Sequence, residues 1–154
     1  MIHLSFNAPA PGAPWRKTWD SVSRVDTENI SEMDLRYKHF GASVDMTIGD
    51  VEIISKNRFV TLVDLALSIS HAIGRLSAGE DAALGFTESE EVIHLRRDGD
   101  LVEISSTKRP FVVSVENGEL VRAFEGFLEG VHSHLTTSFP GLIENPVIRR
   151  LSPR

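Results

Sequence analysis

Residues 91–139 read EVIHLRRDGDLVEISSTKRPFVVSVENGELVRAFEGFLEGVHSHLTTSF and contain the clearest pattern of secondary structure in the chain. Two short apolar segments, 92–95 and 101–104, flank Asp98-Gly99, a dipeptide that favours the positive φ angles of a type I′ hairpin turn. A third apolar segment, 111–115, follows the break at Pro110. We therefore expect three consecutive antiparallel strands in this stretch.

The second half of the stretch predicts one long amphipathic helix. Asn117 is suited to cap its N-terminus, and Pro140-Gly141 is expected to stop it. Apolar residues recur between these limits at alternating intervals of three and four: Val121, Phe124, Leu128, Val131 and Leu135. This spacing places them on one face of a helix.

The first half of the chain predicts the same order, strands and then a helix. Thr61, with Asp64 three residues on, has the form of a capping box, and the broad apolar face that follows predicts a helix ending at Gly79. Alternating residues predict strands over 2–6, 33–39, 44–48 and 51–55, with a type II′ turn at Gly49-Asp50. The stretches 20–32 and 80–90 lack a period and are expected to be loops, and the chain from Asn145 onward is expected to be extended.

These elements predict an α+β fold in which a single domain spans residues 1–154. We expect an antiparallel sheet of about six strands, because every connection between strands is short, with two main α-helices packed on one face. An extended Pro-rich segment (8–14) precedes this core, and a short basic tail (149–154) follows it.

Composition excludes several kinds of chemistry. The chain has no cysteine, so disulfides, thiolate metal sites and cysteine nucleophiles are excluded. The net charge of −6 opposes binding to nucleic acid and to anionic membranes. The most apolar run, 60–73, is too short and too polar to span a bilayer, and the first residues do not resemble a signal peptide, so we expect a cytoplasmic protein.

No motif predicts a catalytic, metal or cofactor site. His132 and His134 are two residues apart and would point to different sides of a helix, so they cannot share one ion. Asp64, Ser68, His71 and Arg75 share one side of the first long helix. A serine in mid-helix lacks the oxyanion donors of a hydrolase, so we interpret this row as a solvent-facing stripe and lean against an enzyme.

The remaining features favour a non-enzymatic protein-binding module of a bacterial type, similar in composition to immunity proteins and antitoxins that mask a basic partner. The acidic stretches 20–34 and 80–91 are the expected contact surface. Trp15 and Trp19 are expected to pack the N-terminal segment onto the domain, the alternative being an exposed anchor for the partner. The candidate partner-binding residues are Trp15, Trp19, Asp20, Asp26, Glu28, Glu80, Asp81, Glu88, Glu90 and Glu91.

Two alternatives remain open from the sequence. One is a small-ligand binder or enzyme with a cleft between sheet and helices, into which His94, Arg96 and Tyr37 would reach. The other is a self-associating protein that forms a homodimer through an open sheet edge or through the second helix.

Overall fold

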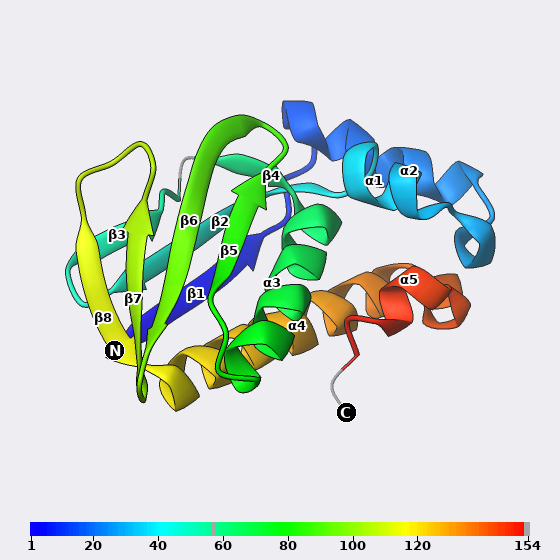
Figure 1. Ribbon diagram of the computed structural model, residues 1–154. Helices are drawn as coiled ribbons and strands as arrows, with labels where there is room; N and C mark the ends of the chain where they lie inside the picture. Colours follow the sequence, from blue (N-terminus) through cyan, green and yellow to red (C-terminus); the bar gives the residue numbers. More distant parts are fainter. Residues whose placement is uncertain (57, 153–154) are drawn as a thin grey trace.

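The computed structural model describes residues 1–56 and 58–152 and has two four-stranded antiparallel sheets, so the predicted α+β class is confirmed (Figure 1). In the first sheet β2 pairs with each of the other strands: β1 (Ile2–Asn7), β2 (Gly41–Ile48), β3 (Val51–Ile54) and β4 (Phe59–Thr61). The second sheet is a meander of β5 (Ala82–Phe86), β6 (Ser89–Asp98), β7 (Leu101–Ser106) and β8 (Val112–Glu116). The described strands thus number eight in two sheets, where the sequence indicated about six in one.

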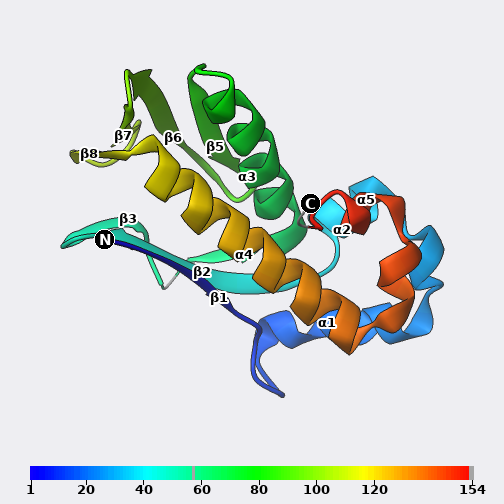
Figure 2. The ribbon, with the colours of Figure 1, turned by 90° about the horizontal axis from the view of Figure 1, so that it is seen from below.

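The two long helices pack against both sheets and against each other. Helix α3 (Leu62–Ser77) packs on β5, and α4 (Asn117–Ser138) packs on α3 and contacts both β1 and the β7–β8 end of the meander. Figure 2 shows α4 running through the wedge between the sheets. Most of both predicted apolar faces is buried there, with Val121 of the α4 face only partly buried. The buried residues of α4 are Leu120, Phe124, Phe127, Leu128, Val131 and Leu135.

Short helices from both ends of the chain form a helical lobe, at the right of Figure 1, whose buried residues belong to the same core as those of the sheets. Its N-terminal part comprises η1 (Pro14–Arg16), α1 (Lys17–Asp20), η2 (Ser21–Arg24), η3 (Thr27–Asn29) and α2 (Glu32–Tyr37). Its C-terminal part comprises η4 (Pro140–Glu144) and α5 (Pro146–Arg149). The prediction of an extended tail was therefore wrong up to Ser152, and residues 153–154 of that tail lie outside the described part.

Asn145 joins the two parts of the lobe. Its side-chain amide donates to the carbonyl oxygens of Thr27 (3.0 Å) and Ile30 (3.1 Å), while its Oδ1 accepts from the backbone of Val147 and Ile148. The residue is completely buried. One side chain therefore caps α5 and holds η3 and the start of α2 against it.

Three local predictions are corrected by the structure. Residues 33–39 are not a strand, because Ser31 caps α2 by accepting from the Asp34 backbone N–H at 3.1 Å. Residues 80–90 are not a loop, because Leu84 and Phe86 face the core from β5. Thr61 does precede α3 but makes no capping box, since its hydroxyl donates instead to Glu88 at 3.0 Å.

Both predicted hairpins are present and both turn on Gly-Asp. Ile48 pairs with Val51 around Gly49 (φ +58°), which fits the predicted type II′ turn. Asp98 pairs with Leu101, so the second turn consists of Gly99 (φ +60°) and Asp100 rather than of Asp98-Gly99. With positive φ at its first position only, this turn is also type II′, and the type I′ prediction was wrong.

Candidate functional site

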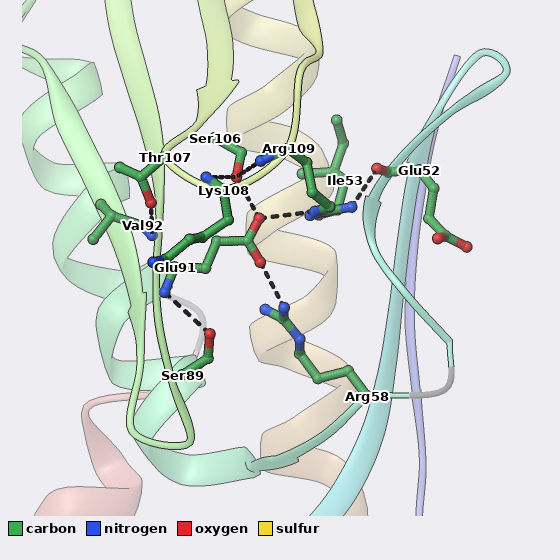
Figure 3. A network of polar contacts seen from close by, with 10 residues as sticks. All are labelled: Glu52, Ile53, Arg58, Ser89, Glu91, Val92, Ser106, Thr107, Lys108 and Arg109. Atoms are coloured by element: carbon green, nitrogen blue, oxygen red, sulfur yellow. Dashed lines mark hydrogen bonds and ion pairs between the residues drawn. The ribbon is translucent and has the colours of Figure 1, made fainter.

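Glu91, at the start of β6, is the centre of a network of polar contacts (Figure 3). The residue is only 1% exposed. Its Oε1 accepts from Arg58 Nη2 at 2.5 Å, and its Oε2 accepts from Arg109 Nε at 2.8 Å and from the Ser106 hydroxyl. Both carboxylate oxygens are therefore occupied by donors from the protein itself.

The two arginines come from different sheets and tie them together. Arg58 lies between β3 and β4, with its guanidinium 4.6 Å from the centre of the Phe86 ring. Arg109 lies between β7 and β8 and also donates to the carbonyl oxygens of Glu52 (2.9 Å) and Ile53 on β3. Glu91 thus fixes two cations that bridge the first sheet to the second.

Two opposing effects determine the pKa, and therefore the charge, of the Glu91 carboxyl. Burial raises the pKa of the Glu91 carboxyl, but hydrogen bonds from Ser106, Arg109 and Arg58 together lower it further, and the net pKa lies below its ordinary value. Glu91 is therefore an anion at neutral pH with no free lone pair directed to solvent. This arrangement suits a structural tie and does not suit a general acid or base.

Three of the residues predicted to contact a partner are buried or half-buried. Trp19 is 1% exposed and its indole N–H donates to the Gly41 carbonyl at 2.7 Å, so it packs the N-terminal segment onto the sheet. Trp15 is half-buried, stacks on Phe59 with ring centres 5.5 Å apart, and lies so close to Gly41 that a Cβ there would collide with its ring. Glu91 is committed to the tie described above. None of the three is an exposed anchor.

The other predicted acidic residues are exposed but do not form one surface. Asp20, Asp26 and Glu28 lie in the helical lobe, whereas the second group lies on the meander. Within that group, Glu80 and Asp81 precede β5, and Glu88 and Glu90 lie beyond its other end. Since β5 has five residues, about 16 Å of strand separates these two pairs.

Two apolar residues of α2 are exposed: Tyr37 (50% exposed), which the sequence offered only for a ligand cleft, and Met33 (70% exposed), to which it gave no functional role. They are four residues apart on α2 and so are neighbours on its outer face. Reading 33–39 as a strand placed both on one face with Leu35 and His39. Only Leu35 and His39 of that set are buried. The Ser31 cap was the available signal, since Ser-x-x-Asp favours a helix start at this point.

Carboxylates without cation partners lie on α2 and at η3, which precedes it in the chain. Glu32 is paired, at 2.8 Å from Arg150 and 3.4 Å from Arg36. Asp26, Glu28 and Asp34 have no ion-pair partner within residues 1–56 and 58–152. We call the set Met33, Tyr37, Asp26, Glu28 and Asp34 the α2 surface.

The groups proposed for an enzymatic cleft do not converge. His94 and Arg96 alternate with buried residues on β6 and face solvent, whereas Tyr37 is on α2 in the helical lobe. In the row on α3, Asp64 accepts from the Thr87 hydroxyl at 2.7 Å and lies 3.4 Å from Arg36. These contacts draw Asp64 to β5 and α2 and away from a role with Ser68 or His71.

One serine, histidine and aspartate do meet, on the outer face of the first sheet. His3 Nε2 lies 3.2 Å from Ser5 Oγ and 3.3 Å from Asp45 Oδ2. A catalytic relay needs serine and carboxylate on opposite ring nitrogens, so this trio cannot pass a proton from one to the other. In the part of the chain that the structure describes, no three metal-ligating side chains gather to hold an ion, and no helix is long and apolar enough to cross a bilayer.

Comparisons with known proteins do not add a family or function. No family model matches the chain, and no significant match was found among curated proteins or solved structures.

Proposed function

We propose that the protein is a non-enzymatic, immunity-like binding module that acts in the cytoplasm and covers a basic partner protein with its α2 surface. The observation that carries this proposal is the exposed Met33–Tyr37 pair on α2, in a lobe that also holds three carboxylates without cation partners. Tyrosine and methionine are enriched at protein interfaces, and tyrosine is frequent among their energetic hot spots. In this proposal Tyr37 is the aromatic anchor at the interface, the role for which the sequence suggested Trp15 or Trp19.

The lobe presents this surface in a fixed shape. Asn145 holds η3 and the start of α2, Leu35 of α2 is fully buried, and the Arg150–Glu32 pair links α2 to the C-terminal part of the lobe. A preorganised surface loses less conformational entropy when it binds. The lobe therefore favours docking of a folded partner over the wrapping of a disordered segment.

Charge defines the partner's chemistry. Asp26, Glu28 and Asp34 fit a surface with lysine or arginine side chains around an apolar hollow that accepts Met33 and Tyr37. Exposed charges of this kind accelerate association and lose their effect as salt is raised. We expect a partner whose association rate falls steeply with ionic strength.

The test is affinity capture with the full-length tagged chain, followed by titration of the purified captured protein. We expect Met33→Ser/Tyr37→Ser to weaken its binding at least about thirtyfold, the loss of one interface hot spot. The control is Leu101→Ser/Val112→Ser, which removes two exposed apolar side chains from the second sheet. A partner lost with the control pair and kept by the α2 pair would place the interface on the meander and refute the proposal.

A second candidate function, self-association, is favoured by the outer edge of β8. Val112 on this strand is 67% exposed, and no side chain among the residues described hydrogen-bonds to the backbone of Val112–Glu116. The β3 edge, by contrast, is covered by Arg109. An uncovered edge with β-branched residues can pair with a second copy. Light scattering of wild type and Val112→Lys tests this, because a dimer through β8 would become a monomer.

A further inference from the structure

A cleft of about 530 Å³ lies where η1, α1 and η2 approach the C-terminal end of α4, away from the Glu91 tie. Side chains that carry charge or can donate hydrogen bonds face it from both sides: Arg16, Asp20 and Arg24 from the N-terminal part, and His134 and Ser138 from α4. Its volume lies within the range of about 300–1,000 Å³ typical of small-molecule sites.

Two guanidinium groups dominate the charge of this cleft. Arg16 is held in place, because its Nη1 donates to the Pro9 carbonyl at 3.2 Å and its Nε to Asp20 at 3.3 Å. These bonds leave Nη2 available. Arg24 makes no hydrogen bond or ion pair with any residue that the structure describes. One carboxylate therefore faces two cations, on a protein whose net charge is −6.

The α4 side adds hydrogen-bonding groups from His134 and Ser138. The His134 imidazole stands edge-on to the rings of Phe6 (centres 5.6 Å apart, 79°) and Trp19 (5.4 Å, 82°). Ser138 is four residues further along α4 and so lies on the same side of the helix. The edge of Trp19, with Phe139, forms an apolar wall of the cleft.

We infer that this cleft binds a small organic phosphate. The phosphate is held by Arg16 Nη2 and Arg24, with hydrogen bonds from the His134 ring and the Ser138 hydroxyl, because guanidinium groups match the geometry of phosphate oxygens. The organic part lies against Trp19 and Phe139. The inference does not depend on the α2 surface, which is formed by other residues.

Calorimetric titration of the full-length protein with phenyl phosphate, inorganic phosphate and phenol tests the inference, with the His134 ring resonances as a local reporter. We expect one saturable site for phenyl phosphate, weaker binding of inorganic phosphate, and none of phenol. Arg24→Gln should weaken phenyl phosphate binding at least about tenfold, because it removes a charged hydrogen-bond donor.

Arg122→Gln is the matched control, since it removes one exposed arginine near the start of α4, where it lies 4.0 Å from Glu116. This variant should bind phenyl phosphate as the wild type does. The inference is overturned if phenyl phosphate does not saturate, if it binds no more tightly than inorganic phosphate, or if Arg24→Gln and Arg122→Gln bind equally well. Binding that leaves the His134 resonances unmoved would also overturn it.

Discussion

Glu91 and Asn145 are buried polar side chains that hold together different regions of the molecule, the first joining the two sheets and the second joining the two parts of the helical lobe. Both carboxylate oxygens of Glu91 accept from partners distant in sequence, whereas in Asn145 only the amide nitrogen contacts distant residues and Oδ1 accepts from Val147 and Ile148 nearby. They differ in charge, because Glu91 holds two arginines whereas Asn145 holds backbone groups. The Glu91 contacts are therefore sensitive to acid, whereas the Asn145 contacts involve no titratable group.

The largest effect is expected from Glu91→Gln. The change leaves Arg58 and Arg109 without their counter-ion in a largely dry junction, which should cost about 3 kcal/mol of unfolding free energy. Urea unfolding measures the loss. Glu90→Gln is the control, because Glu90 is exposed and lies 3.6 Å from Lys108, so its loss should be below about 0.5 kcal/mol. Equal losses in the two variants would show that Glu91 is no tie.

A smaller loss, about 2 kcal/mol, is expected from Asn145→Asp. The introduced carboxylate still accepts from Val147 and Ile148 but no longer donates to the carbonyls of Thr27 and Ile30, which remain buried and unpaired. Hydrogen exchange should show the opening confined to η3, α2 and α5. Exchange rising equally in the β6–β7 hairpin would contradict the separation between lobe and sheets.

Titration distinguishes the two ties further. The Glu91 pKa is lower in the folded protein than its ordinary value of 4.5, so its contribution is complete above pH 4.5 and is lost as pH falls through the folded value. The difference in unfolding free energy between wild type and Glu91→Gln should therefore narrow below pH 4.5.

His39 is a second buried group whose charge affects stability. Burial and then Lys38 lower its pKa from 6.5, so the stability contributed by its neutral form declines as pH falls below 6.5.

Asn145→Asp should show the opposite sign. Burial against two carbonyl oxygens raises the pKa of the introduced carboxyl in the folded state, so the variant is closest to wild type at low pH and loses stability as pH rises through that value. Urea unfolding at pH 4 and pH 7 measures this difference. A cost that does not change with pH would mean that the introduced group reaches solvent and that the lobe is open at Asn145.

The sequence predicted those elements whose side chains have a strict period and a buried face. The hairpin of β6 and β7 and the helices α3 and α4 are of this kind, since Ile93, Leu95, Phe124 and Val131 all face the core. It failed at α2, where Met33 and Tyr37 are apolar but exposed, so alternation carried no information on burial. A local pattern cannot distinguish an apolar residue that packs in the core from one that stays exposed.

Long-range polar contacts could not be predicted from the sequence, for a different reason. Glu91 stands beside two other glutamates and looks solvated in the sequence, yet its partners are 33, 15 and 18 residues away. Asn145 contacts carbonyls 118 and 115 residues away. A carboxylate becomes a buried tie only when the topology brings cations to it, and topology is not encoded in the spacing of neighbouring residues.

The smallest stability effect is expected from Met33→Ser/Tyr37→Ser. Both side chains are at least half exposed, so their removal should change unfolding free energy by no more than about 0.5 kcal/mol, while partner binding falls at least about thirtyfold. Urea unfolding measures the change in stability, and titration of the captured partner measures the change in binding. A loss near the 2 kcal/mol of Asn145→Asp would mean that these residues pack within the lobe, and reduced binding would then follow from unfolding. Unchanged stability with lost binding would separate the α2 surface from the ties that support it.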